Sequence, residues 1–169
     1  MLWLAVLGVM LVASTASANE LQAPPGWRFP TDADYKGKWI EYRDDFPVPY
    51  RVVADFDGNG QQDEAWILIR DKGEGYALYV FMGNKKGKAR TIKIFSYDEC
   101  CAQNYAVSLV NPGKILTVCG QMPDECPPSE PKSITLRRPG FDVISLGTAS
   151  GLYYWDSMLR GFRRVSDAD

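Results

Sequence analysis

The sequence predicts an all-β protein, built as an antiparallel sheet or sandwich of about 8–10 short strands. Short apolar runs recur along the chain, and Gly, Pro, Asn and Asp separate them. The runs are rich in Val, Ile, Tyr, Phe and Trp, which suit a pleated, half-buried surface. After the N-terminal apolar segment, no stretch keeps a helical period for three turns without an interrupting Gly or Pro. We therefore expect strands joined by tight turns, with room for one short helical turn.

The individual runs differ in how their apolar residues are arranged. Residues 76–82 are continuously apolar, which indicates a central strand covered on both faces. Residues 92–94 and 134–136 alternate between apolar and polar side chains, which is typical of a strand with one face in solvent. Residues 120–132 contain four prolines and predict a long loop that is held at one end by cysteine chemistry. The expected strands, in chain order, are residues 39–42, 50–54, 65–69, 76–82, 91–95, 105–110, 115–119, 134–136, 141–146 and 152–155.

Length and composition indicate one domain with a core of its own. The chain has 169 residues, of which 46% are hydrophobic and 24% are charged, and its net charge is -2. Residues 19–38 are interpreted as an extended lead-in, and residues 39–169 as a single β domain. Acidic and basic residues are interspersed, which argues against nucleic acid as a partner. The densest basic cluster lies at residues 85–90, and we interpret it as a solvated hairpin tip.

The N-terminus has the features of an export signal. Residues 2–13 form an apolar run of about 12 residues, which is too short to span a hydrocarbon core. The small-residue pattern that signal peptidases cut follows it and ends at Ala18. We predict a signal peptide over residues 1–18, cleaved after Ala18, and a secreted or periplasmic protein with no membrane span after cleavage. The segment departs from the usual signal in lacking Lys or Arg before its apolar run. The alternative is an uncleaved anchor.

The four cysteines favour disulfide bonds, because export places the chain in an oxidising compartment. Cys100, Cys101, Cys119 and Cys126 allow three pairings. The adjacent pair, Cys100 and Cys101, is hard to bridge to itself without backbone strain. We therefore expect one or both of them to pair with Cys119 or Cys126. A zinc site is the rival interpretation, but the chain has no His and no paired CxxC spacing.

Five residues between two expected strands have the spacing of calcium ligands. Asp55, Asp57, Asn59 and Asp63 place side-chain oxygens at the first, third, fifth and ninth positions of a loop, and Gln61 at the seventh offers its backbone carbonyl. Three carboxylates this close in sequence repel one another unless a cation or solvent screens them. We therefore predict a hairpin with a structural Ca²⁺ site formed by these five residues. The alternative is a metal-free hairpin turn, which the Asp-Gly and Asn-Gly dipeptides also favour.

The loop departs from an EF-hand and resembles a different family. Gly60 occupies the sixth position, as in an EF-hand, but the twelfth position is Trp66 rather than a bidentate Glu, and the flanking residues are strand-like. Residues 53–65, VADFDGNGQQDEA, resemble the calcium loop of FG-GAP and VCBS-type repeats, present here in a single copy. The resemblance implies a strand–loop–strand hairpin in which the Asp and Asn side chains named above bind Ca²⁺.

Residue content excludes most catalytic systems. The absence of His removes Ser-His-Asp and Cys-His systems, and the chain has no GxSxG elbow, Walker loop or dinucleotide fingerprint. A pair of carboxylates remains as a catalytic device, as in glycosidases. A small secreted hydrolase is therefore the alternative to a non-enzymatic protein. The candidate carboxylates are Asp98, Glu99, Asp124 and Glu125.

The aromatic residues indicate that the protein could bind a ligand through an exposed ring. Most of them should fill the core, but the consecutive rings at 153–155 must either expose one ring or lie in a strand buried on both faces. An exposed ring there would belong to a sugar- or protein-binding surface. We expect a non-enzymatic Ca²⁺-binding β domain whose partner is another protein or an envelope component. The aromatic residues concerned are Trp27, Trp39, Trp66, Tyr153, Tyr154 and Trp155.

Overall fold

The structure is a computed structural model that describes residues 21–85, 90–122, 124, 126 and 130–166. The predicted signal segment lies outside the described residues, as do residues 86–89 of the basic cluster and Glu125. Of the helices in the described residues, none is both long enough and apolar enough to cross a lipid bilayer.

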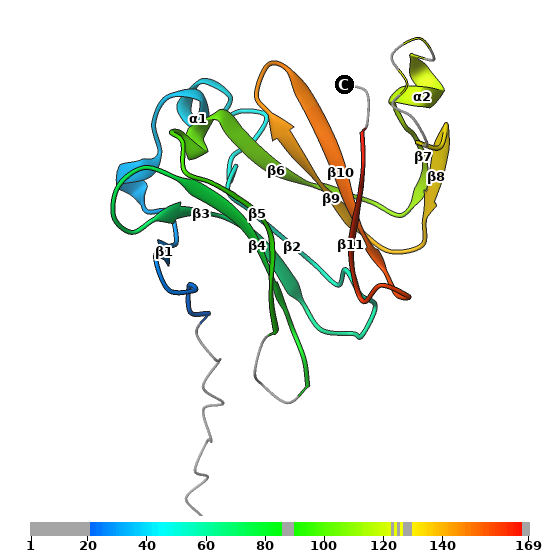
Figure 1. Cartoon of the computed structure of the whole chain (residues 1–169), viewed down its shortest axis with the longest axis horizontal. Coiled ribbons are helices and arrows are strands. Elements are labelled where there is room, and N and C mark those ends of the chain that lie inside the picture. Colours follow the sequence, from blue (N-terminus) through cyan, green and yellow to red (C-terminus); the bar gives the residue numbers. More distant parts are fainter. Residues whose placement is uncertain (1–20, 86–89, 123, 125, 127–129, 167–169) are drawn as a thin grey trace, which may run out of the picture.

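The described chain consists mainly of strands joined by turns, so the predicted all-β fold is confirmed (Figure 1). The strands are β1 (Trp27–Arg28), β2 (Arg51–Ala54), β3 (Asp63–Arg70), β4 (Tyr76–Met82), β5 (Arg90–Tyr97), β6 (Tyr105–Val110), β7 (Gly113–Leu116), β8 (Ser133–Leu136), β9 (Gly140–Ser145), β10 (Ala149–Asp156) and β11 (Gly161–Val165). The helical turns are η1 (Asp32–Asp34), α1 (Lys38–Glu41), η2 (Ala102–Asn104) and α2 (Val118–Gln121).

The strands form two antiparallel sheets and one separate hairpin. In the first sheet, β3 pairs with β4 and β4 pairs with β5. Along the other edge of β3, two short strands lie end to end: β1 pairs with residues 69–70 and β2 pairs with residues 63–66. The second sheet has the order β11-β10-β9-β6, and β7 pairs with β8 in the hairpin.

The main core lies between the two sheets. Its buried side chains come from β2, β3 and β4 on one side and from β6 and β9 on the other. A second cluster lies on the outer face of the first sheet, where the lead-in residues Trp27 and Phe29 cover Ala77, Tyr79 and Phe81 of β4. Every residue of β4 is buried, which confirms the prediction of a strand covered on both faces.

The β7–β8 hairpin covers the outer face of the second sheet. Leu136 of β8 packs with Leu152 of β10 and Val165 of β11, and all three side chains are buried. Ile115 and Ile134 extend the same contact from the hairpin. This packing brings the turn between β8 and β9 close to β10.

The expected strand at residues 39–42 is wrong, because these residues form α1. Trp39 is fully buried in the main core, and its Nε1 donates to the carbonyl of Tyr105 at 2.7 Å. One helical turn is sufficient to point this side chain inward, and no neighbouring strand pairs with the segment among the described residues. The burial of the Trp39 ring in the core therefore determines the local structure here, and the strand propensity of the segment does not.

Two further differences concern strand ends and short strands. The expected strand at 115–119 ends at Leu116, since α2 begins directly after Thr117. The short strands β1 and β11 were not among the expected ones. β1 has only two residues, and β11 carries exposed Arg163 and Arg164, so neither contains the apolar run that indicates a strand.

The disulfide pairing also differs from the expected one. Cys119 pairs with Cys126 and Cys100 pairs with Cys101, so the expectation of a bond between the two groups is wrong. The reason is their separation in the fold: Cys100 and Cys101 precede β6, and Cys119 lies in α2 beyond β7 (Figure 1). β6 alone extends the chain by about 20 Å. The expectation that the cysteines form disulfides is confirmed.

An ion pair fastens the lead-in segment. Arg28 donates to both carboxylate oxygens of Asp34, at 2.7 Å and 2.9 Å. Asp34 also accepts hydrogen bonds from the backbone N–H and the hydroxyl of Thr31, at 2.8 Å and 2.9 Å. The hydrogen bonds from Arg28, and after them those from Thr31, hold the pKa of Asp34 well below its usual range, although burial opposes this shift.

Replacement of the Asp34 carboxylate is expected to show how its contribution to the free energy of unfolding depends on pH. Asp34→Asn should lower the free energy of unfolding by about 1–2 kcal/mol at neutral pH, since solvent screens the partly exposed Arg28 and weakens the pair. A pKa that is lower in the folded state stabilises the protein above the unfolded pKa of about 3.9, and this stabilisation is lost as the pH falls through the folded value. Urea unfolding of both proteins at neutral pH and at about pH 2.5 measures the difference, which should shrink in acid. An equal difference at both pH values would contradict the assignment.

Candidate metal centre

The predicted ligands lie in the loop between β2 and β3. The two strands are antiparallel, and their last pair joins Ala54 to Asp63. Gly58 and Gly60 adopt positive φ angles of 75° and 80°, which let the chain turn sharply at both positions. The expected strand–loop–strand arrangement is therefore confirmed, in place of the two helices that flank an EF-hand loop.

Three of the five predicted ligands bring their carboxylates together. Asp55, Asp57 and Asp63 each have a carboxylate oxygen within 4.8 Å of the others. Asp63 is fully buried, whereas Asp55 and Asp57 are half-buried at the surface of the loop. The ion pairs found among the described residues include none of the three. In the described part of the chain, the cluster is therefore not neutralised by an ion pair with Lys or Arg.

Asp55 organises the backbone of the loop. Its Oδ1 accepts hydrogen bonds from the N–H groups of Gly58 at 2.8 Å and Asn59 at 3.0 Å, and its Oδ2 accepts one from Gly60 at 2.8 Å. The loop is thus wrapped around this carboxylate. An ionised carboxylate has about four acceptor sites, so these three bonds leave capacity for a further partner.

Asp57 and Asn59 bond to each other across the surface of the loop. Asp57 Oδ1 accepts from the Asn59 N–H at 3.0 Å, and Asp57 Oδ2 accepts from Asn59 Nδ2 at 3.2 Å. Asn59 Nδ2 also donates to the carbonyl of Gly83 at 2.9 Å, while Asn59 Oδ1 accepts from the N–H of Gln61 at 2.7 Å. Asn59 and Gln61 therefore share the loop with the three carboxylates, and their role as ligands stays a prediction.

Asp63 ties the loop to the first sheet. Its Oδ2 accepts from the N–H of Phe56 at 2.8 Å and its Oδ1 from the N–H of Gly83 at 2.7 Å. Burial raises the pKa of Asp63 to about 6, although both of these hydrogen bonds act to lower it. The fold therefore holds a carboxylate in a place where water stabilises its charge poorly. A bound cation would supply that stabilisation, because a nearby positive charge favours the ionised form.

Two residues of this site give no signal in the loop spacing. Gly83 follows β4 and contacts the loop through both its N–H and its carbonyl. A Cβ at Gly83 would collide with the carbonyl of Gln62, so the close approach requires glycine. Arg138 is 81 residues from Asp57, and its Nη1 donates to the Asp57 carbonyl. In the sequence, both residues stand in turn separators, which indicate a place between strands but no contact with this loop.

The carboxylates considered for hydrolysis lie in different parts of the fold. Asp98 and Glu99 follow β5, and Asp98 forms an ion pair with Arg70. Asp124 follows α2, and Figure 1 shows α2 on the other side of the molecule from the end of β5. The structure therefore does not bring Asp98 and Asp124 together as a pair.

Comparison of the chain with protein-family models gives no match, and neither curated proteins nor solved structures give one. The resemblance to FG-GAP and VCBS-type loops rests on residues 53–65 alone and stays a prediction. The geometry supplies a compact set of carboxylate oxygens with an amide side chain beside them. Oxygen donors of this kind are those that hard cations such as Ca²⁺ and Mg²⁺ prefer.

Proposed function

We propose that this protein is an exported, non-enzymatic β domain that binds Ca²⁺ and acts as a binding module for another protein or an envelope component. The ion is held by the side chains of Asp55, Asp57, Asn59 and Asp63 and by the carbonyl of Gln61. The observation that carries the proposal is the approach of three carboxylates to within 4.8 Å of one another. The disulfides are consistent with an oxidising compartment outside the cytoplasm.

Calcium has a structural role in this proposal. The loop joins β2 to β3 and, through Gly83, contacts the end of β4, so an ion there fixes one corner of the first sheet. The loop also meets Arg138 in the turn that leads into the second sheet. A surface that is fixed before it meets a partner loses less conformational freedom on binding, which favours affinity.

Calorimetric titration of the chelator-treated protein with Ca²⁺ is expected to show saturable binding of about one ion per chain. At a free Ca²⁺ concentration of about a hundred times Kd, the free energy of unfolding should rise by about 2.7 kcal/mol, because the ion binds the folded chain. Asp57→Ala should abolish both effects, since it removes one carboxylate at the loop surface and leaves the buried core unchanged.

Asp44→Ala is the matched control for this titration. The Asp44 side chain is 98% exposed and its ion pair with Arg43, at 3.7 Å, lies outside the loop. This variant should bind Ca²⁺ as the unsubstituted protein does. Absence of heat together with an unchanged melting temperature at millimolar Ca²⁺ would reject the calcium site, and equal loss of binding in both variants would reject the assigned ligands.

A further inference from the structure

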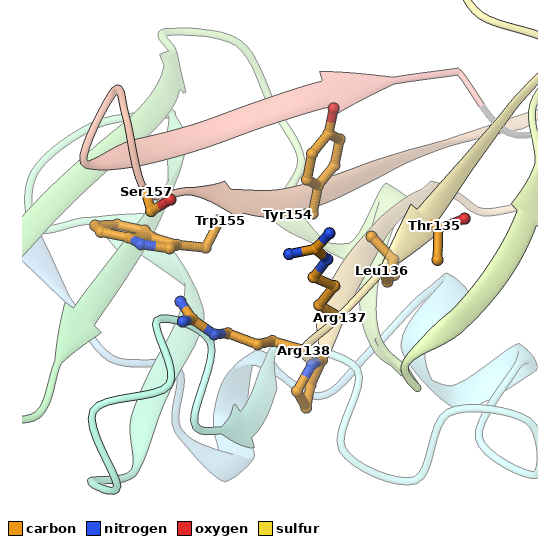
Figure 2. Close-up of a pocket in the computed structure, with 8 residues that line it drawn as sticks. Thr135, Leu136, Arg137, Arg138, Tyr154, Trp155 and Ser157 are labelled. Carbon is orange, nitrogen blue, oxygen red and sulfur yellow. The ribbon is translucent and has the colours of Figure 1, made fainter.

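A cavity of about 230 Å³ lies between the β8–β9 turn and the end of β10 (Figure 2). Eight residues line it, and among them there is no Asp or Glu. The lining combines two guanidinium groups, two aromatic rings and two aliphatic hydroxyls, and is therefore positively charged. The residues that supply these groups are Arg137, Arg138, Tyr154, Trp155, Thr135 and Ser157.

The two guanidinium groups give the cavity the positive charge that attracts an anion. Figure 2 shows the two arginine side chains diverging from the turn, Arg137 toward Tyr154 and Arg138 toward Trp155. The ion pairs formed within the described part of the chain include neither Arg137 nor Arg138. Arg138 donates to the Asp57 carbonyl, which leaves most of its five N–H donors for another acceptor. A guanidinium group matches a carboxylate in a bidentate pair.

The remaining lining groups suit a small polar ring. Tyr154 and Trp155 are half-buried neighbours in β10 and point to opposite faces of the strand, Tyr154 toward the β7–β8 hairpin and Trp155 toward the main core. Each ring still exposes part of its surface. Thr135 and Ser157 are exposed and offer hydroxyl groups that both donate and accept. The cavity is smaller than the ~300–1,000 Å³ of typical small-molecule sites, so it admits one ring-sized group rather than a nucleotide. A sugar residue presents C–H groups to the aromatic surface and hydroxyls to the polar side chains.

We propose that this cavity binds a carboxylate-bearing sugar residue of an acidic polysaccharide. Arg137 binds the carboxylate, Arg138 adds positive charge to the same cavity, and Trp155 packs against the sugar ring. The inference deepens the binding role proposed above and rests on it, because it names the ligand class of the module. An anionic lipid headgroup such as phosphatidylglycerol offers the charge without the sugar ring, and would leave the aromatic surface unused.

Calorimetric titration with a galacturonic acid tetramer and with a hyaluronan tetramer, in the presence of chelator, tests this proposal. Carboxyl-reduced galacturonic tetramer is the matched ligand, since it keeps the rings and loses the charge. We expect saturable binding of an acidic tetramer and binding of its reduced form that is weaker by about tenfold or more. Arg137→Gln should lower the affinity for the acidic tetramer by a similar factor and leave the Ca²⁺ titration unchanged. Arg43→Gln, at an exposed arginine outside the cavity, should alter neither titration.

Several outcomes would overturn the proposal. The first is the absence of binding to both acidic tetramers, and the second is equal affinity for the acidic and the carboxyl-reduced galacturonic tetramer. The third is an equal loss of affinity for the acidic tetramer in Arg137→Gln and Arg43→Gln. Binding to phosphatidylglycerol vesicles without tetramer binding would assign the arginines to a membrane surface instead. The sugar titration runs in chelator and the Ca²⁺ titration runs without sugar, so either can fail alone. Loss of the Ca²⁺ signal with sugar binding intact would reject the calcium site and keep the sugar site.

Discussion

Replacement of Asp63 by alanine is expected to lower the free energy of unfolding by about 2–4 kcal/mol, even in the absence of calcium. Asp63 is fully buried, and its carboxylate accepts the N–H groups of Phe56 and Gly83 at 2.8 Å and 2.7 Å. Alanine leaves both donors without this acceptor, and each unsatisfied donor costs about 1–3 kcal/mol when it is buried. Part of that cost is offset because a poorly solvated carboxylate is removed. Urea unfolding in chelator measures the change.

The informative comparison is with Asp57→Ala under the same conditions. The Asp57 carboxylate accepts hydrogen bonds from Asn59, and these lie in the exposed part of the loop. In chelator, this variant should therefore unfold within about 0.5 kcal/mol of the unsubstituted protein. Both variants should lose calcium binding, but only Asp63→Ala should be destabilised without the ion. Equal unfolding midpoints for the two variants in chelator would show that Asp63 has no structural role beyond the metal.

Phe56→Ala should destabilise the protein by about 3–5 kcal/mol, the usual cost of emptying the site of a buried aromatic ring. Phe56 lies within the loop, between two of the proposed ligands, yet its side chain is fully buried. Its ring packs edge-on against Phe141 at a centroid distance of 5.2 Å and against Phe162 at 6.0 Å. The loop is therefore anchored in the core between the sheets. Thermal and urea unfolding in chelator measure the loss.

Two further variants make this result specific. Phe56→Leu keeps most of the apolar volume and should recover a large part of the lost stability. Met158→Ala truncates a side chain that is 93% exposed, so it should change the free energy of unfolding by no more than about 0.5 kcal/mol. If Phe56→Ala cost no more than Met158→Ala, the loop would be attached to the strands by its backbone alone.

Features that depend on local pattern could be predicted from the sequence. The continuous apolar run of β4 predicts a strand covered on both faces, because its apolar side chains point to both faces of the sheet. The positions of Gly58 and Gly60 predict sharp turns, and both have positive φ. The spacing of Asp55, Asp57 and Asp63 indicates one cluster, and the hairpin between β2 and β3 brings these carboxylates together.

Features that depend on contacts between distant segments could not be predicted in this way. Trp39 lies in a run with strand-like composition, and its contact with the Tyr105 carbonyl, 66 residues away, is invisible in that run. The same holds for Arg138, whose contact with the loop depends on how the β7–β8 hairpin folds over the second sheet. The cavity beside Arg138 follows from that folding too. Its two arginines and two aromatic residues come from separate segments, and each segment alone is interpreted as a turn or a strand.

The end-to-end placement of β1 and β2 along β3 has a consequence for self-association. On that side of the first sheet, a second molecule meets two short strands in place of one long edge with free backbone groups. On the other side β5 is the outermost strand in the described part of the chain, and it exposes Arg90, Thr91 and Lys93. Charged side chains on an edge strand oppose the addition of a strand from another molecule. Both edges of the first sheet therefore disfavour polymerisation by strand addition.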